Sequence, residues 1–138
     1  MVLAGRLHPL LAHFPIALIL SATAAELIAI ATRRPAWQAV AFIQTRAGAL
    51  FAAGTAIAGW LLASSQDIDQ SPALEWHRWL ALLATAAALM AAAATIGAQR
   101  STSRRRLYQV LLFASAASVA LAAHLGATLV WGAHFFHF

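Results

Sequence analysis

The 138 residues are 62% hydrophobic and 9% charged, with a mean hydropathy of +0.76, values that exceed those of ordinary water-soluble domains and predict an integral membrane protein. The net charge of +5 comes from arginine without lysine, and the clustering of the arginines between apolar segments favours a membrane topology over nucleic-acid binding. The absence of cysteine excludes disulfides, thiolate metal sites, iron–sulfur clusters and covalently attached c-type haem.

In chain order, four apolar segments predict four transmembrane helices. The first begins at His8-Pro9 and ends before Arg33-Arg34-Pro35, where the prolines are ordinary start and stop signals. The third begins at Ser71-Pro72, a capping serine followed by a first-turn proline. The expected helices cover about 9–31, 36–64, 72–98 and 107–131.

One helical bundle accounts for the whole chain, because each membrane span needs about 20 residues and nothing remains for a soluble domain. We therefore expect an all-α, up-down-up-down four-helix transmembrane bundle that forms a single domain over residues 1–138. The tripeptide Ala22-Thr23-Ala24 imitates a signal-peptide cleavage site, but the apolar run continues through Ile30. We expect a retained first helix.

Arginine positions predict the orientation in the membrane. Two connections on one side carry most of the arginines, whereas Arg6 and Arg78 flank the other side. Because positively charged loops stay in the cytoplasm, we expect a multi-pass protein of the bacterial inner membrane with both termini in the periplasm. The arginines on the cytoplasmic side are Arg33, Arg34, Arg100, Arg104, Arg105 and Arg106.

The chain has six histidines, and all of them fall in the outer half of this topology. A histidine inside a bilayer usually faces the bundle interior or a functional site. With a rise of about 1.5 Å per residue, His13, His77 and His124 lie roughly 7–10 Å deep on three different helices. Nearer the outer surface lie His8, His134 and His137. We therefore expect the three deeper imidazoles to form one layer.

The first interpretation of this layer is a b-type haem with two axial imidazoles. His124 is the expected first ligand, and His13 or His77 is the expected second. Arg78 would pair with a haem propionate, and Gly126 would let the flat macrocycle approach a helix backbone.

Two other interpretations stay open. A copper or zinc site would use imidazoles alone. Alternatively, the histidines only make hydrogen bonds between helices, and the protein is a cofactor-free structural subunit. The candidate metal ligands are His124, His13, His77, His8 and His134.

Two polar residues interrupt the apolar segments toward the cytoplasmic side. Glu26 on the first helix and Arg46 on the second are the opposite charges available there. We expect them to form an ion pair that fixes the register of the two helices, with a proton or quinone site as the alternative.

Both ends of the chain resemble a known family. Segment 8–16, HPLLAHFPI, resembles the HPLLxHFPI opening of the bacterial membrane family called domain of unknown function 2231, and segment 124–134, HLGATLVWGAH, is similar to its HLGGxLVYxxG ending. Ala127 replaces the second glycine of that ending and Trp131 its tyrosine, while His77 resembles a third-helix histidine of the family. The resemblance implies a four-helix inner-membrane protein, and fusions of its relatives to Rieske and cytochrome domains imply electron transfer.

The sequence therefore predicts a membrane-embedded b-type haem protein that passes electrons as a small subunit or partner of a redox complex. An accessory role is expected rather than that of a stand-alone enzyme, because no placed nucleophile and base are visible. The expected partners are the lipid bilayer, other membrane redox subunits or a periplasmic electron carrier, and a second copy of the chain in a homo-oligomer; nucleic acid is not among them.

Overall fold

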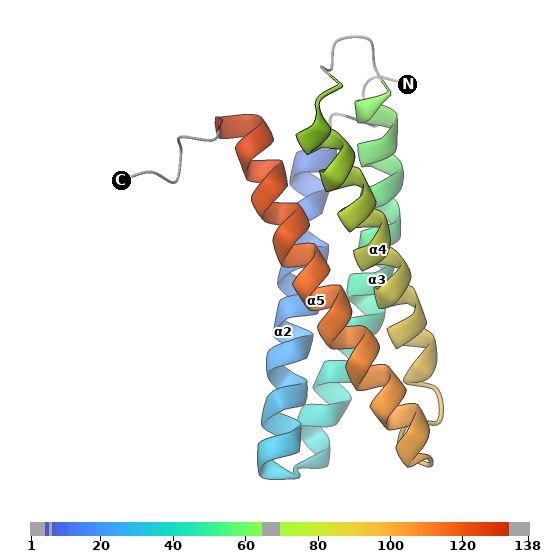
Figure 1. Ribbon diagram of the computed structural model, residues 1–138. Helices are drawn as coiled ribbons and strands as arrows, with labels where there is room; N and C mark the ends of the chain where they lie inside the picture. The colour runs from blue at the N-terminus through green and yellow to red at the C-terminus, as the bar shows by residue number, and fades with distance from the viewer. Residues whose placement is uncertain (1–4, 6, 65–69, 133–138) are drawn as a thin grey trace.

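The computed structural model describes residues 5, 7–64 and 70–132. In this part of the chain, four long helices follow one another: α2 (His8–Thr32), α3 (Pro35–Ala63), α4 (Pro72–Ala94) and α5 (Thr102–Trp131). All four are long and apolar enough to cross a membrane. They run alternately up and down, so that the start of α2 and the end of α5 lie at the same end of the molecule (Figure 1). This architecture confirms the predicted all-α transmembrane bundle.

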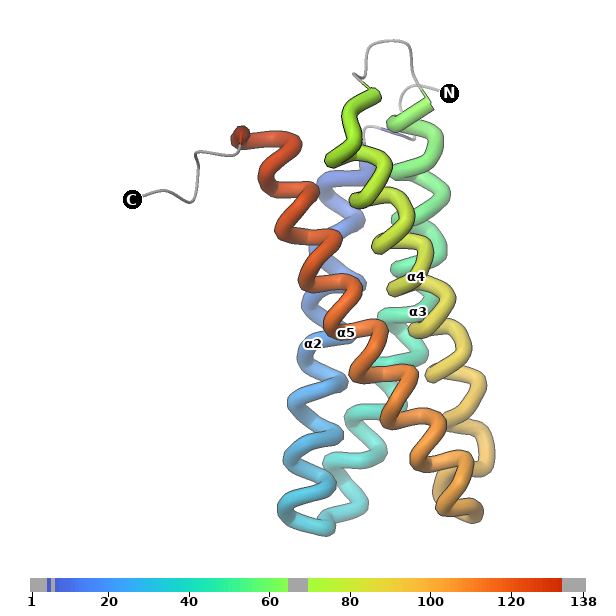
Figure 2. The backbone as a smooth tube through the Cα atoms, in the orientation of Figure 1, coloured from blue at the N-terminus to red at the C-terminus, as the bar shows by residue number. Residues whose placement is uncertain are grey.

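The helices are arranged as two hairpins. Helix α2 packs most extensively on α3, and α4 packs most extensively on α5, while smaller α3–α4 and α2–α5 contacts join the hairpins. Figure 2 shows the α4–α5 hairpin crossing in front of the α2–α3 hairpin. Each helix therefore has one close neighbour within its hairpin and a looser neighbour in the other hairpin.

The connection between α4 and α5 differs from the expectation. Helix α4 ends at Ala94 rather than near residue 98, and Gly97 in the following turns has φ of +80°, which glycine adopts without steric cost. Helix α5 begins at Thr102 rather than near residue 107, because the Ser101 side chain accepts a hydrogen bond from the Arg104 backbone N–H at 3.4 Å. The run of three arginines that we expected in a loop thus lies at the start of α5, where arginine is a good helix former.

Small residues line the helix interfaces. Most buried apolar side chains are alanines, and the largest that are almost completely buried are Tyr108, Ile19 and Leu112. Large apolar side chains lie on the outside instead, such as Leu50, which is 73% exposed. In a bilayer these side chains meet acyl chains, and the helices are held together by close backbone approach.

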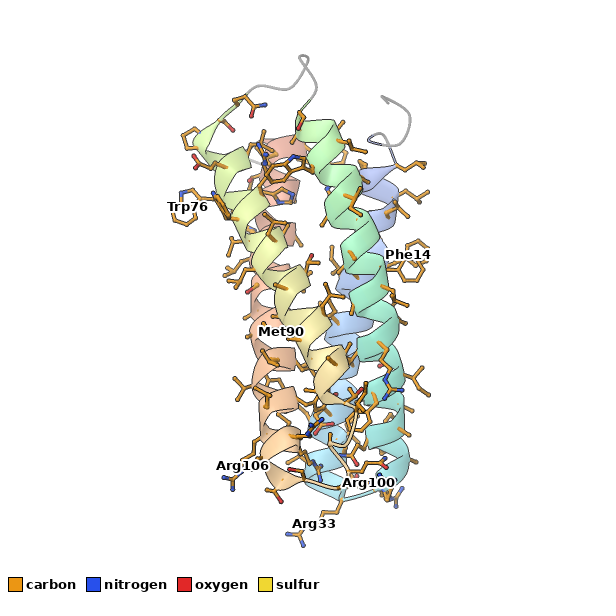
Figure 3. The ribbon with its side chains drawn as sticks, turned by 90° about the vertical axis from the view of Figure 1, so that its right-hand side faces the viewer. Phe14, Arg33, Trp76, Met90, Arg100 and Arg106 are labelled. Atoms are coloured by element: carbon orange, nitrogen blue, oxygen red, sulfur yellow. The ribbon has the colours of Figure 1, made fainter. Side chains whose placement is uncertain are left out.

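The two ends of the bundle differ in character. Arg33, Arg100 and Arg106 lie together at one end, whereas Trp76 and Phe14 lie toward the other (Figure 3). We refer to these as the basic end and the histidine end, since His8 and His77 lie in the first turns of α2 and α4.

Candidate metal site: two histidines between the helix hairpins

His8, at the first position of α2, reaches across to α3. Its Nδ1 lies 3.0 Å from the backbone oxygen of Thr55. Gly59 follows one turn later on α3, and a Cβ at this position would lie 2.7 Å from the imidazole ring. Since real Cβ contacts are essentially never so short, the glycine creates the space that the ring fills.

His77, in the first turns of α4, reaches across to α5 in the same manner. Its Nδ1 lies 2.8 Å from the backbone oxygen of Ala122. Gly126 follows one turn later, and a Cβ there would lie 3.1 Å from Cε1 of the ring. Gly126 therefore makes room for an imidazole, whereas the sequence suggested room for a macrocycle.

The two hairpins thus present their histidines equivalently. In each, the ring comes from the first helix, bonds a carbonyl of the second helix, and packs on the glycine four residues beyond that carbonyl. The two rings then meet between the hairpins, with centroids 6.2 Å apart and planes at 84°. His8 and His77 therefore form one pair, which we call the histidine pair.

The hydrogen bonds fix the chemistry of the pair. A backbone carbonyl only accepts, so Nδ1 of each ring must be the donor and carry the hydrogen. In a neutral imidazole this leaves the lone pair on Nε2. A second-shell carbonyl on the far nitrogen is the usual support of a metal-bound histidine, because it holds the tautomer and the ring orientation.

The ring separation can be compared with metal geometry. With metal–nitrogen bonds of about 2.0–2.1 Å and each nitrogen about 1.1 Å from its ring centre, two imidazoles on opposite sides of one metal have centres about 6.3 Å apart. A tetrahedral angle would bring the centres to about 5 Å. The observed centre separation of 6.2 Å is nearer to the first of these two distances, so His8 and His77 are the residues that would hold such a metal.

A further polar group is available beside the pair. The hydroxyl of Thr55, the residue whose carbonyl holds His8, is buried and has no hydrogen-bond partner among the described residues. Buried polar groups without partners are uncommon. A ligand with an acceptor atom would satisfy this hydroxyl.

The expected layer of three imidazoles does not form. His13 is exposed, with Nδ1 2.7 Å from the Pro9 carbonyl of its own helix, and His124 is also exposed. In their place His8, which we expected nearer the surface, lies against His77. Within the described ranges, no group of three His, Cys, Asp or Glu residues could hold a metal ion. His134 and His137 lie outside the described residues.

The reason is the angular position of each residue on its helix. Depth along the axis places residues at one level, but each step also turns the helix by about 100°. His13 is therefore turned about 140° away from His8, which faces the interior. Level is a necessary condition for a shared ligand, and facing direction decides which residues meet.

Arg78 follows His77 and lies at the edge of the histidine end. Its guanidinium carbon is 4.0 Å from the ring centre of Trp60, a cation–π contact. Both residues line a cavity of about 350 Å³ together with Glu75 and Trp79. Arg78 is thus already partnered by an aromatic ring, and the expected propionate pairing remains a prediction.

The basic end contains a second polar cluster, and here the expected ion pair is corrected. Glu26 receives a hydrogen bond from Gln109 at 2.7 Å and lies 3.8 Å from Arg105. Arg46 instead donates to the hydroxyl of Thr95, which follows the last residue of α4, at 2.9 Å. The two charges on α2 and α3 were expected to pair because they are the opposite charges within the apolar segments there, yet α5 supplies the partners of Glu26.

The sequence pointed to Gly126 but not to the other residues that position the histidine pair. These are Gly59, which packs on His8, and Thr55 and Ala122, whose carbonyls accept from the two rings. A backbone carbonyl leaves no mark on residue type, so the acceptors were invisible. The signal that was available is spacing, since a small residue stands four positions before Gly59 and before Gly126, but the same spacing recurs before Gly97 and Gly132 and so does not single out the pair.

These features define a class, a four-helix membrane protein that brings two imidazoles together between its hairpins. Residues 5–135 match the model of a family described as a predicted membrane protein, DUF2231, and the chain belongs to this family. The resemblance drawn from the two terminal motifs is thereby confirmed. Comparisons with curated proteins and with solved structures found no match.

Proposed function

We propose that the histidine pair holds one b-type haem and that the protein carries electrons as a small subunit or partner of a membrane redox complex. The observation that carries this proposal is the pair itself: both Nδ1 atoms bond carbonyls, both Nε2 atoms are left for a metal, and the rings stand 6.2 Å apart. His8 and His77 are then the two ligands, in place of a set that includes His13 or His124.

The ligand geometry supports haem over zinc. A structural zinc ion takes four ligands at tetrahedral angles, which would bring the ring centres nearer than observed. Haem iron accepts two axial imidazoles on opposite faces. Bound there, the iron would change between ferric and ferrous states and so carry one electron. A linear copper ion between the same two rings is the second candidate, because imidazole also suits copper.

We also propose the membrane and the orientation. Arg33, Arg100 and Arg106 lie at the basic end (Figure 3), and the positive-inside rule assigns that end to the cytoplasm of a bacterium. The histidine pair then lies in the outer half of the inner membrane. A periplasmic electron carrier or an outward-facing redox subunit would reach it there.

The test is a spectrum with matched histidine variants. We expect the purified protein to contain iron and to show a Soret band and sharp bands on reduction. His8→Ala and His77→Ala should each lose the bound metal by roughly tenfold or more, because one axial ligand is removed. His13→Ala and His124→Ala, which change exposed imidazoles, should keep the spectrum.

The outcomes separate the candidates. Copper without iron, lost on the same two substitutions, would favour the copper site. An iron- and copper-free preparation after expression with haem supplied would overturn the proposal. Equal effects of all four substitutions would show that the histidine pair has no special role.

A further inference from the structure

The polar cluster at the basic end contains a buried carboxylate, Glu26, whose hydrogen bonds are incomplete. Glu26 is 0% exposed, on the face of α2 that is buried in the bundle. Its Oε1 makes both contacts given above, whereas its Oε2 is buried with no hydrogen-bond partner among the described residues. Half of a buried acceptor group is therefore left unused, which is costly for a carboxylate.

The arginine opposite is incompletely paired in the same way. The Nη2 atom of Arg105 lies 3.8 Å from Oε1, beyond ordinary hydrogen-bond length, and its Nε is buried without a partner in the described part of the chain. Arginine and carboxylate usually meet through two parallel short bonds. Here a gap separates them, and each side has one free polar atom.

Other unpartnered atoms lie on α3 toward the same end. They are the side-chain nitrogen of Gln38 and the side-chain oxygen of Gln44. The unpartnered atoms of this end of the bundle therefore include both donors and acceptors. Water supplies both functions, and buried water typically occupies such places.

Arg105 links the buried carboxylate to the surface. Its side chain is 39% exposed, while its Nη2 approaches Glu26 and its Nε is buried. Glu26 lies on α2 and Arg105 on α5, and these helices form the less extensive of the seams that join the hairpins. The other charged or titratable neighbours are Tyr108, which interacts electrostatically with both, and Arg46, which is turned to α4.

We propose that water molecules bond the unpartnered Oε2 of Glu26 and Nε of Arg105, and that Glu26 exchanges protons with the aqueous phase at the basic end. The ligand class is water, and the site is a proton-binding carboxyl inside the membrane bundle. An ionisable group at such a depth is costly and is commonly part of a proton path. This assignment is independent of the histidine pair, which lies at the other end.

The composition makes a single-residue test feasible. The chain has two glutamates, Glu26 and Glu75, so in the Glu75→Gln variant Glu26 is the only glutamate. Labelling with ¹³C-carboxyl glutamate then gives an infrared carboxyl signal from Glu26 alone, in the full-length protein in phosphatidylcholine vesicles. The variant is mild because Glu75 is exposed. The Glu26→Gln variant, which keeps Glu75, provides the reference signal of an exposed glutamate.

We expect the labelled carboxyl to show an acid band that shifts promptly in deuterated buffer, because Glu26 then exchanges its proton with the aqueous phase. An Arg105→Leu variant should slow this shift, since the guanidinium lies beside the carboxyl. A labelled band that stays the same in deuterated buffer, in protein that is folded by circular dichroism, would overturn the proposal.

Discussion

Glycine positions decide where the two imidazoles stand. Gly59 and Gly126 lie against His8 and His77, whereas Gly54 on α3 has no atom within 4 Å of a built Cβ. A methyl group is therefore tolerated at Gly54 but not at Gly59, about one and a half turns further along the same helix. Steric fit at single positions thus sets the geometry of the pair.

The Gly59→Ala substitution tests this fit. The added methyl group overlaps the His8 ring, so either the ring leaves the Thr55 carbonyl or the helices move apart. We expect overpacking of about 1–3 kcal/mol to outweigh a helix-propensity gain of about 1 kcal/mol. Thermal unfolding in detergent measures the loss of stability, and iron content measures the accompanying loss of metal.

Gly54→Ala is the matched control in the same helix. It should keep the metal and raise the free energy of unfolding by up to about 1 kcal/mol, since alanine favours the helix. If both alanine variants behaved alike, close approach at Gly59 would not position His8.

For single residues, the sequence identifies histidine as the residue type of the candidate site but not which histidines contact each other. His77 was expected in the inner layer, and the structure places its ring against that of His8. A histidine close to the start of an apolar helix has a definite depth. The expected neighbours were His124 and His13, whereas the structure places His8 against His77, because the histidine that faces the interior depends on how each helix is rotated against its neighbours. Side chains of neighbouring helices decide this rotation, and they are distant in sequence.

Among the helices, α5 begins earlier than its apolar pattern indicates. The Ser101 side chain accepts from the Arg104 backbone N–H, so the cap recruits the arginines into the helix. Capping chemistry is local and readable in the sequence, yet hydropathy alone places the start several residues later. The remaining helix ends lie within a residue of the proline and serine signals, except where the turn containing Gly97 shortens α4.

Ser101→Ala tests the cap. Loss of an N-cap side chain costs about 0.5–2 kcal/mol, and we expect a decrease of about 1 kcal/mol in the free energy of unfolding. Ser103→Ala, at an exposed position in the first turn, should change it by less than about 0.5 kcal/mol. Thermal unfolding of both variants under one detergent condition gives the comparison. A larger effect at Ser103 would contradict the assigned cap.

For the molecule as a whole, charge asymmetry predicts how the bundle sits in the membrane. The chain has no cysteine, so a single introduced cysteine is a unique label. Ser103 lies at the basic end and Ser64 at the histidine end, and both are exposed. In bacterial cells, a membrane-impermeant thiol reagent should label Ser64→Cys directly and Ser103→Cys only after permeabilisation. The opposite pattern would reverse the orientation.

The bundle could be predicted because lipid leaves few choices for the backbone. Spans must be helical, their length is fixed by the bilayer, and short connections force antiparallel neighbours. The pairing of α2 with α3 and of α4 with α5 follows from the same rule. How one hairpin rotates against the other does not, since alanine-lined interfaces carry little side-chain pattern.

The equivalence of the two hairpins has a consequence for folding. Each ring is bonded within its own hairpin through Nδ1, so its remaining nitrogen is left for a contact outside that bond. A metal held by both rings, as proposed, would be a removable cross-link, and its binding free energy would add to the association of the two hairpins. At a free concentration 100 times the dissociation constant this amounts to about 2.7 kcal/mol. Depletion of the metal would leave the helix content unchanged and loosen the assembly between halves.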